Sequence, residues 1–352
     1  MHAVVFKINL QQPEEDKIKI VAQSLCNGGL AIIPTETVYG VAADMRNQIA
    51  VSRLYKIKQR PKDRPFSLHI DNKQDLEDFA TGLDQLAFKL IDKFWPGPLT
   101  LILSAKDNNT VGLRMPDNNI ALRLISVVGA PLFCPSANLS GKPPPTSLDE
   151  AMRDLGQKVD VAIDAGKTRL GIESSVVDLT KKPYKIQRQG ALSAEKIQEV
   201  ASKKIVLFVC TGNSCRSVMA KAFLEKRLKQ GNRQDIEVVS AGTLGFSNLG
   251  VSPETKQVLE SEGIYVRGHK SVQVNSLMIK KSDIILVMQR MHEEKILEMV
   301  PEARTRLFLL KEFAKIQDGS LDIRDPIGRP VDFHKQTFST IKQAVDRVVK
   351  IL

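Results

Sequence analysis

The chain has 352 residues, with 51 Lys or Arg, 40 Asp or Glu and four Cys, and its formal net charge is +11. A hydrophobic fraction of 42% excludes an intrinsically disordered chain, and four Cys are too few for a disulfide framework. No apolar run approaches the ~20 residues that span a bilayer. The opening residues lack the basic-then-apolar pattern of a secretion signal, so we expect a cytoplasmic protein with no membrane partner.

The first half of the chain predicts a mixture of helices and strands. In chain order the patterns are helix 13–25, strand 30–33, helix 49–57, strand 66–70, a helix before Trp95 and strand 99–103. A helix-like segment over 193–204 then ends where a fresh apolar strand opens at Ile205. Because ~100–200 residues is the usual domain size, we expect two α/β domains, at residues 1–200 and 204–352.

The second half alternates strands and helices more regularly. The predicted elements are strand 205–209, helix 217–229, strand 236–239, helix 253–262, strand 284–288, helix 289–299, strand 306–309 and helix 336–351. Strands separated by helices predict a doubly wound parallel sheet. Ligands of such folds bind beyond the carboxyl ends of the strands, so the loops that follow these strands are the first place to look for a site.

The basic excess is concentrated in the second half. Up to residue 200 there are 26 basic and 23 acidic residues, and the remainder has 25 basic and 17 acidic residues. This charge fits anionic ligands such as phosphates, nucleotides or RNA, and it is equally consistent with simple solubility.

The run Val-Cys-Thr-Gly-Asn-Ser-Cys-Arg-Ser, residues 209–217, lies where a predicted strand ends and a predicted helix begins. A glycine-containing loop there turns backbone N–H groups inward, and the helix N-terminus adds a partial positive charge. Arg216 can hold two phosphate oxygens, and in this field we expect Cys210 to carry a thiolate that attacks a phosphoryl group in line. The loop residues expected to cradle the phosphate are Thr211, Gly212, Asn213, Ser214 and Cys215.

The leaving group of such a reaction needs a proton donor, and Asp325 followed by Pro326 offers a carboxylate on a rigid loop late in the chain. By itself an Asp-Pro pair predicts only a turn.

Together these segments resemble the low-molecular-weight protein tyrosine phosphatase family, from about residue 204 to the C-terminus. That family has Cys-x5-Arg-Ser near its start and an Asp-Pro acid near its end. The resemblance implies that Cys210 is the nucleophile, that Arg216 binds phosphate and that Ser217 assists the thiolate. Asp325 is then the general acid and base, and Asn213 braces the loop.

The resemblance leaves the phosphorylated residue open. Ile327-Gly328 follows the Asp-Pro pair, where eukaryotic members have an aromatic pair that lines the tyrosine pocket. Ser214 stands where tyrosine-specific members have a bulky aliphatic residue, and a small hydroxyl residue there is similar to the protein-arginine phosphatase branch. We therefore expect a phosphoprotein substrate that carries phosphotyrosine or phosphoarginine. In this family Cys215 can form a reversible disulfide with the nucleophile, and the alternative is a buried small apolar side chain.

In the first half, four cations fall within seven residues and are interrupted by prolines: Lys58, Arg60, Lys62 and Arg64. Such a charge run is typical of a solvated loop, and it could also clamp a triphosphate, because basic side chains offset the charge that builds on a leaving pyrophosphate. No Walker-type phosphate loop occurs. From the residues alone, this half predicts a polar pocket that tolerates phosphate.

Five separated motifs in the first half, over about residues 10–200, resemble the YrdC/Sua5 family of L-threonylcarbamoyladenylate synthases: PTETVYG, KQRP, WPGPLT, PSANLSG and ESSVVD. The resemblance implies a twisted mixed-sheet domain that condenses L-threonine, bicarbonate and ATP into threonylcarbamoyl-AMP and pyrophosphate. Mg²⁺ would bridge the ATP phosphates, with no tightly bound cofactor and no metal held by the chain alone. The adenylate is the donor for N6-threonylcarbamoyladenosine at tRNA position 37, so a threonylcarbamoyl transferase complex is an expected partner and tRNA a further candidate.

The family motifs also imply site residues. Those expected to hold L-threonine are Thr37, His69, Arg114, Ser136 and Ser175. Those expected to line the ATP site are Lys58, Arg60, Arg64, Thr110, Asn138, Thr146 and Arg188. No side chain in this half resembles a covalent nucleophile, so we expect catalysis by positioning and charge, with Lys58 and Arg60 offsetting the phosphate charge.

The leading interpretation is a bifunctional enzyme, an adenylate synthase for tRNA modification fused to a cysteine phosphatase. A rival interpretation treats the first domain as an RNA-binding or regulatory module for the phosphatase. In a third, the phosphatase domain is inert and senses oxidants through Cys210 and Cys215.

Overall fold

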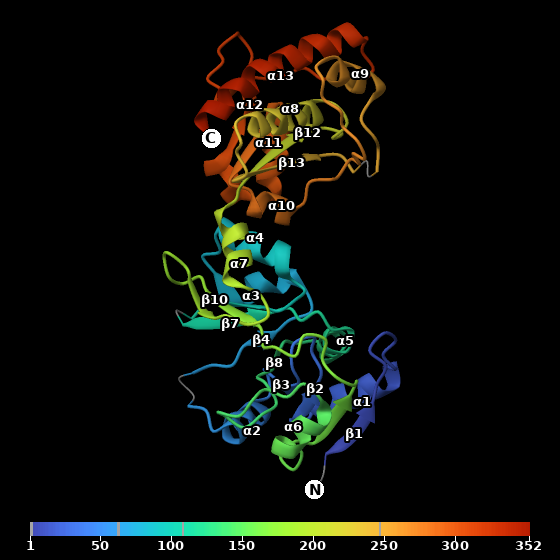
Figure 1. Ribbon diagram of the computed structural model, residues 1–352, viewed down its shortest axis with the longest axis vertical. Helices are drawn as coiled ribbons and strands as arrows, with labels where there is room; N and C mark the ends of the chain where they lie inside the picture. The colour runs from blue at the N-terminus through green and yellow to red at the C-terminus, as the bar shows by residue number, and fades with distance from the viewer. Residues whose placement is uncertain (1–2, 62–63, 108, 246–247) are drawn as a thin grey trace. The chain divides into compact units, whose positions relative to one another are not determined.

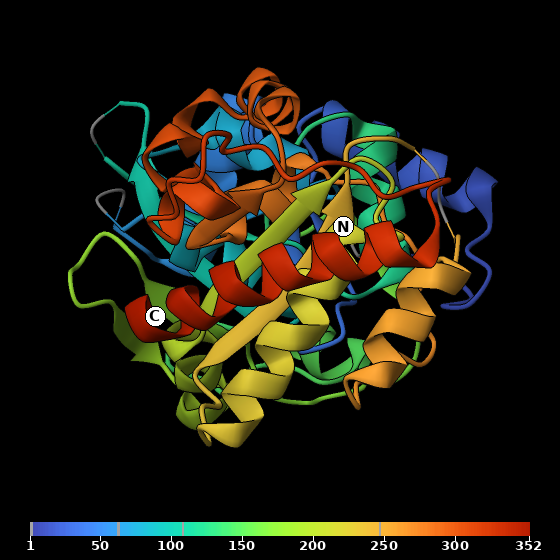
Figure 2. The same ribbon diagram turned by 90° about the horizontal axis from the view of Figure 1, so that it is seen from above.

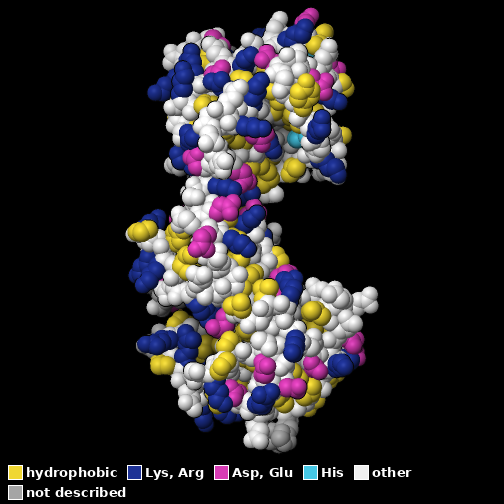
Figure 3. All heavy atoms as spheres, viewed as in Figure 1, with side chains coloured by type: hydrophobic (Ala, Val, Ile, Leu, Met, Phe, Trp, Pro, Cys, Tyr) yellow, Lys and Arg dark blue, Asp and Glu magenta, His cyan; other side chains and the backbone are white. Residues whose placement is uncertain are grey.

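The computed structural model describes residues 3–61, 64–107, 109–245 and 248–352. The chain divides into two compact units, residues 1–83 with 89–200 and residues 201–352 with 84–88 (Figure 1). Within the described residues, no helix combines the length and apolarity needed to cross a membrane. On the face shown in Figure 3, basic side chains are interspersed with acidic ones over both units.

The first unit is built on one mixed sheet. Its strands follow the order β1 (Val4–Lys7), β9 (Val161–Asp164), β2 (Ala31–Ile33), β3 (Gly40–Asp44), β8 (Leu132–Phe133), β4 (Leu68–His69), β7 (Thr110–Arg114), β6 (Leu99–Ala105), β10 (Ser175–Asp178) and β11 (Lys185–Arg188), and β5 (Ala80–Thr81) pairs with β6. The sheet contains both parallel pairs, such as β4/β7, and antiparallel pairs, such as β3/β8. The mixed sheet expected for this half is confirmed.

Helices cover both faces of this sheet. The helices within residues 1–202 are α1 (Glu15–Cys26), α2 (Gln48–Lys58), α3 (Leu76–Phe79), α4 (Gln85–Phe94), α5 (Asn119–Val128), α6 (Leu148–Leu155) and α7 (Ala194–Ser202), with a 3₁₀ turn η1 (Lys73–Asp75). Ile33 packs in the core under α1 and α5, whereas Ile32 packs in the core under α2 and α6. The two-residue period of a strand sends these neighbours to opposite faces, so an all-apolar strand such as β2 is buried on both sides.

The second unit has a parallel sheet in the order β13 (Ile236–Gly242), β12 (Lys204–Cys210), β14 (Ile284–Val287) and β15 (Leu307–Leu309). Its helices are α8 (Arg216–Gln230), α9 (Pro253–Ser261), α10 (Ser276–Lys281), α11 (Arg290–Met299), α12 (Leu310–Phe313) and α13 (Val331–Ile351), with a 3₁₀ segment η2 (Pro301–Arg306). α8 and α13 cover one face, and α10 and α11 cover the other (Figure 1). The doubly wound parallel sheet is confirmed.

The central strand of this unit places the site. Val206 and Phe208 of β12 pack towards α8 and α13, while Leu207 and Val209 pack towards α10 and α11. Figure 2 shows α13, in red, running across the strands of this sheet. Cys210 closes the strand at its carboxyl end, the edge where doubly wound folds bind ligands.

Candidate active sites

The loop predicted to bind phosphate connects β12 to α8. Cys210 is the last residue of β12, and Arg216 is the first residue of α8. Between them Asn213 has a left-handed backbone, with φ 51°, a conformation that Asn tolerates better than most side chains. The loop packs against Gly242, where a Cβ would lie 2.7 Å from the Thr211 carbonyl oxygen. Only glycine therefore fits beside the loop.

Asn213 orders the hydrogen bonds around Cys210. Its Oδ1 accepts from the Val272 N–H at 3.0 Å, which fixes the amide orientation, and its Nδ2 donates to the hydroxyls of Ser217 and Ser240 at 3.0 Å each. Because Ser217 Oγ accepts this bond, its own proton is available to Cys210 Sγ, 3.0 Å away. A hydroxyl proton directed at sulfur stabilises a thiolate.

Arg216 is 1% exposed and its guanidinium is held on several sides. Nη1 donates to Gln289 Oε1 at 2.5 Å and to the Ile323 carbonyl at 3.0 Å. Nη2 donates to Thr211 Oγ1 at 2.9 Å and forms an ion pair with Asp325. Nε is buried and has no partner among the described residues. Nearly all buried N–H groups are paired in proteins, so a buried guanidinium donor left without a partner is a feature of an anion site.

His292 lies against the same loop, although it belongs to α11. Its Nδ1 accepts from the backbone N–H of Gln289 at 3.1 Å, so its proton is on Nε2, which lies 2.9 Å from Thr211 Oγ1. Burial and the charge of Arg216 lower the pKa of His292 to about 4. The imidazole is therefore neutral near pH 7 and donates to Thr211.

A pocket of about 250 Å³ lies over this loop, and Cys210, Arg216 and Asp325 all line it. The predicted loop residues also line it, except for Asn213, which lies behind the loop: Thr211, Gly212, Ser214 and Cys215. Beyond the loop and Asp325, the described lining is aliphatic, formed by Leu244, Leu249 and Ile327. The nucleophile, cation and acid predicted from two distant motifs therefore share one cavity.

The second thiol, Cys215, is buried and free, as is Cys210. Its Sγ donates to Ser252 Oγ at 3.3 Å and lies 3.6 Å from Ser214 Oγ. The thiol is therefore hydrogen-bonded inside the unit, and the disulfide that the resemblance implies stays a prediction.

The first unit holds a pocket of about 330 Å³ that crosses the sheet from β3 and β8 to β6 and β10. The predicted residues that line it are Lys58, Arg60, His69, Arg114, Ser136, Asn138 and Arg188. β4 and β7 pair in parallel with His69 opposite Arg114, which places two predicted threonine ligands side by side.

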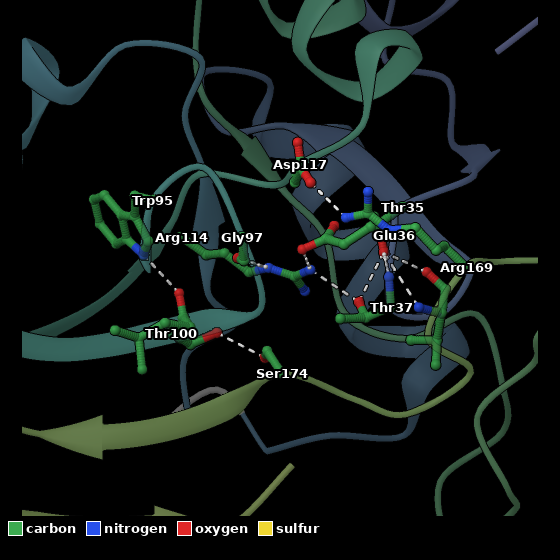
Figure 4. Close-up of polar contacts among 12 residues, drawn as sticks. Thr35, Glu36, Thr37, Trp95, Gly97, Thr100, Arg114, Asp117, Arg169 and Ser174 are labelled. Atoms are coloured by element: carbon green, nitrogen blue, oxygen red, sulfur yellow. Dashed lines mark hydrogen bonds and ion pairs between the residues drawn. The ribbon is translucent and has the colours of Figure 1, made fainter. Parts of the chain in front are cut away.

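Arg114 is a buried cation fixed from two directions (Figure 4). Its Nε donates to the Gly97 carbonyl at 3.3 Å, and its Nη2 donates to Glu36 Oε1 at 2.7 Å and to Thr37 Oγ1 at 2.9 Å. Both protons of Nη2 are thereby used, and Nη1 has no partner among the described residues. The guanidinium can therefore offer Nη1 to a carboxylate in the pocket.

His69 is 3% exposed, and its Nδ1 is buried without a partner among the described residues. Burial and the neighbouring charge of Arg114 lower the pKa of His69 well below its ordinary value. The ring is therefore neutral, with one nitrogen able to donate and the other able to accept. A neutral imidazole beside a guanidinium can bind the polar groups of an amino acid without adding charge.

Lys58 is buried at the end of α2, and its ammonium binds the loop that follows β8. Nζ donates to the Ser136 carbonyl at 2.7 Å, to the Asn138 carbonyl at 2.5 Å and to Asn138 Oδ1 at 3.1 Å. Burial, and then the charge of Arg60, lower the pKa of Lys58 to about 8. All three N–H groups are engaged, so Lys58 acts on a bound phosphate mainly through its field and by holding Ser136 and Asn138 in place.

Two further cations, Arg60 and Arg188, border the same pocket, and both are exposed. Arg60 donates through Nε to the Arg64 carbonyl at 2.8 Å, and its guanidinium lies 4.9 Å from the ring centroid of Phe66. Arg188 donates to Glu173 Oε1 at 2.8 Å and is exposed. Both side chains can exchange protein contacts for phosphate oxygens at little cost, because they are already solvated.

Two predicted threonine ligands are buried outside the pocket lining. The Thr37 hydroxyl contacts Arg114. The Ser175 hydroxyl donates to the Leu192 carbonyl at 2.7 Å and accepts from the Gly190 N–H at 2.9 Å. Thr37 therefore reaches the pocket through Arg114, and Ser175 fastens the segment that follows β11.

Three predicted ATP ligands also lie outside the lining. Arg64 is exposed, and Thr110 is exposed at the start of β7, the strand that Arg114 ends. Thr146 donates through its hydroxyl to Glu150 at 3.1 Å. Their roles towards ATP stay predictions, and Lys62 of the predicted cationic run lies outside the described residues.

The motif analysis passed over several residues that shape these sites: Glu36, Thr100, Ser174, Gln289 and His292. Glu36 is part of the first motif and is separated by two residues from the end of an apolar strand, and a carboxylate so close to a buried strand is a signal of an ion pair. Thr100 and Ser174, which both line the pocket, share a hydroxyl–hydroxyl bond of 2.8 Å (Figure 4). His292 had one signal, a histidine in the first turn of a predicted helix that follows a site-facing strand.

Among the residues described, no group of three or more His, Cys, Asp or Glu side chains is placed to hold a metal ion. The only carboxylate in the described lining of the first pocket is Glu173, which pairs with Arg188. Mg²⁺ typically binds substrate phosphates and one or two carboxylates, so this lining fits an ion that arrives with its nucleotide.

Comparison with known families covers both units. The Sua5/YciO/YrdC family model, described as "Telomere recombination", matches residues 23–190, and the model described as "Low molecular weight phosphotyrosine protein phosphatase" matches residues 205–352. A crystal structure of Pyrococcus abyssi Sua5 complexed with L-threonine superposes with a TM-score of 0.55 at 24% identity, over 97% of this chain and 98% of that one, and shares the fold.

Individual relatives also match either the first unit or the second. The threonylcarbamoyl-AMP synthase of Pyrococcus abyssi is 42% identical over 196 residues, 53% of this chain but only 58% of that protein. The putative threonylcarbamoyl-AMP synthase of Methanocaldococcus jannaschii is 35% identical over 55% of this chain and 96% of its own length. The protein-arginine-phosphatase of Geobacillus stearothermophilus is 37% identical over 42% of this chain and 95% of its own length. The chain thus belongs to the Sua5/YciO/YrdC family of threonylcarbamoyl-AMP synthases through its first unit and to the low-molecular-weight phosphatase family through its second.

Proposed function

We propose that the chain is a bifunctional enzyme that forms threonylcarbamoyl-AMP in its first unit and dephosphorylates proteins in its second. The observation that carries the proposal is common to both pockets. Each contains a buried polar group that has no partner among the described residues, His69 Nδ1 in one and Arg216 Nε in the other. Such groups are costly unless a ligand satisfies them. Several cationic side chains line the first pocket beside His69, and in the second pocket the unpaired donor belongs to the cation Arg216 itself.

In the first pocket, L-threonine places its carboxylate on Arg114 Nη1 and its amine and hydroxyl near neutral His69. The amine and bicarbonate condense to a carbamate with loss of water. A carbamate oxygen then attacks the α-phosphorus of MgATP, and pyrophosphate leaves. Arg60 and Arg188 bind phosphate oxygens while the field of Lys58 offsets the developing charge. No covalent enzyme intermediate is needed, because orientation and charge supply the catalysis.

The names of the relatives support this chemistry, and one solved relative contains L-threonine. The product would pass to a threonylcarbamoyl transferase that modifies tRNA. The test is pyrophosphate release by the full chain, which should require L-threonine, bicarbonate and MgATP together. Release independent of threonine contradicts the proposal, and tRNA binding without turnover would favour an RNA-binding module.

In the second pocket, Cys210 Sγ attacks the phosphorus and forms a cysteinyl phosphate as the leaving atom takes a proton from Asp325. Water, deprotonated by Asp325, then cleaves the S–P bond and releases phosphate and free Cys210. Arg216 Nε and Nη2 hold the phosphoryl oxygens. The incoming phosphoryl group replaces Asp325 on Nη2, which frees that carboxyl group to serve the leaving atom.

Phosphoarginine is the substrate that we favour for this unit. The small Ser214 lines the pocket, the described walls beyond the loop are aliphatic, and one relative that is 37% identical is a protein-arginine-phosphatase. Matched peptides carrying phosphoarginine or phosphotyrosine test this, with Cys210→Ser as the inactive control. A tyrosine preference contradicts the assignment, and turnover of neither peptide favours a domain that only senses oxidants.

A further inference from the structure

We propose that His292 is a positioning residue for phosphate binding, which closes a ring of hydrogen bonds through Thr211 and Gln289 and so fixes the Arg216 guanidinium. The inference rests on the proposed phosphatase function of the second unit and assigns a role to a side chain outside both sequence motifs. His292 itself does not line the pocket.

The ring has four hydrogen bonds. Arg216 Nη1 donates to Gln289 Oε1 at 2.5 Å, and the backbone N–H of Gln289 donates to His292 Nδ1 at 3.1 Å. His292 Nε2 then meets Thr211 Oγ1 at 2.9 Å, and Arg216 Nη2 donates to the same oxygen at 2.9 Å. The ring therefore joins both terminal nitrogens of the guanidinium to the N-terminal turn of α11.

The direction of each bond follows from the donors available. The Gln289 N–H can only donate, so His292 Nδ1 must accept and Nε2 carries the proton. Arg216 is always a donor, so Thr211 Oγ1 accepts from both neighbours. Its own hydroxyl proton is then left over, and Thr211 lines the pocket. The ring thereby leaves the Thr211 hydroxyl as a donor for a phosphoryl oxygen.

The position of His292 in α11 allows it to make both of its hydrogen bonds in the ring. Gln289 is the N-cap of this helix and His292 is its third residue, whose side chain reaches back to the N-cap N–H. Glu or Gln usually makes that capping contact. Glu would cap the helix but could not donate to Thr211, whereas Gln offers an acceptor and a donor, as neutral histidine does.

The ring matters because Arg216 has a competing partner. The side chain of Asp325 is 32% exposed and pairs with Nη2, so without the ring only the bond from Nη1 to the Ile323 carbonyl opposes a movement of the guanidinium towards that carboxylate. Held by Thr211 and Gln289, Arg216 keeps Nε and Nη2 directed at the position over Cys210 when a phosphoryl group displaces Asp325. Pre-positioning of this kind lowers the reorganisation needed on binding and in the transition state.

The test compares His292→Glu with His292→Gln in the full chain. The readouts are kcat and KM on a phosphoarginine peptide and the Kd of inorganic phosphate. Misplacement of one catalytic group costs up to about a hundredfold, so we expect His292→Glu to lower kcat/KM and phosphate affinity at least about tenfold. His292→Gln should restore both to within about threefold of the wild type, since it rebuilds the two hydrogen bonds.

Thr211→Val and Thr211→Ser form a second matched pair, in which the serine variant should lose less than the valine variant. Asn275→Ala, which removes the N-cap of α10 in the same unit, controls for the loss of a helix cap and should leave both readouts unchanged.

The inference is overturned if His292→Glu matches the wild type in phosphate affinity, or if His292→Gln falls as far as His292→Glu. The phosphate Kd separates it from the proposed function. A wild type that binds phosphate but turns over no phosphopeptide contradicts the phosphatase proposal, and the same variants still test the ring.

Discussion

The two pockets each contain a buried arginine paired with a carboxylate, and the difference lies in the carboxylate. In the first unit the side chain of Glu36 is 1% exposed beside Arg114, whereas in the second the side chain of Asp325 is 32% exposed beside Arg216. A buried pair cannot open without leaving a charge unsatisfied, but a half-exposed carboxylate can be replaced by another anion. Glu36 is therefore a permanent partner, and Asp325 an exchangeable one that is free to take part in catalysis.

The sharpest way to break this comparison is to neutralise each carboxylate. Glu36→Gln leaves the charge of Arg114 buried without a counter-ion and should cost about 3–5 kcal/mol of unfolding free energy. Trp95, the single tryptophan of the chain, is buried in the first unit, so its fluorescence during denaturation reports that unit.

The matched variant is Asp325→Asn. It should cost less stability than Glu36→Gln, because Asp325 is partly solvated and Arg216 keeps its bonds to Gln289, Thr211 and the Ile323 carbonyl. It should nevertheless lower phosphatase turnover by about 10²–10⁴-fold through loss of the proton donor. Equal stability losses in the two variants would remove the distinction between a permanent and an exchangeable partner.

The pH dependence of the unfolding free energy should differ between the wild type and the variant His292→Gln. The pKa of His292 is lowered from 6.5 to about 4 by burial and by Arg216, while Asp325 and Asp322 oppose that shift. The unfolded chain therefore binds the extra proton first, and stability should fall as pH drops from about 6.5 to about 4, by up to roughly 3 kcal/mol.

Chemical denaturation followed by circular dichroism at several pH values measures this slope for the second unit. His292→Gln should have a smaller slope over the same pH range, because it carries no titrating ring. Parallel slopes for the two proteins would show that His292 is not the group responsible.

We expect a smaller effect of pH on the KM for MgATP, through the charge of Lys58. Since burial and Arg60 lower its pKa to about 8, its charge is lost as pH rises through that value, and the KM for MgATP should rise about threefold between pH 7 and pH 9. Lys58→Arg keeps its charge over this range, so the ratio of the two KM profiles isolates the effect. A constant ratio would mean that the Lys58 charge is not felt at the phosphates.

Most of the site residues that could be predicted from the sequence belong to contiguous motifs. Cys210 and Arg216 can be paired from sequence because a strand end and a helix start fix the loop between them. Site residues are harder to predict from a motif that runs along a strand. Thr110 and Arg114 share β7, but they lie at its opposite ends, and of the two only Arg114 lines the pocket. Proximity in the sequence does not specify which end of a strand faces a ligand.

Contacts between elements that are distant in the sequence could not be predicted from the sequence. His292 meets Thr211 only because β14 lies next to β12 in the sheet and α11 begins beyond it, an order that the alternation of helices and strands does not give. Lys58 was predicted to line the ATP site and to offset the phosphate charge, whereas its three bonds to the loop at Ser136 and Asn138 depend on how α2 docks and were not predicted.

The most direct test of the account measures both activities in one preparation of the full chain with two single variants, Arg114→Ala and Arg216→Lys. We expect Arg114→Ala to lose threonine-dependent pyrophosphate release and to keep phosphatase turnover. Arg216→Lys should do the reverse, because lysine cannot supply the forked donors of arginine. Loss of both activities in either variant, or persistence of both in Arg216→Lys, would contradict two separate pockets each centred on its own buried arginine.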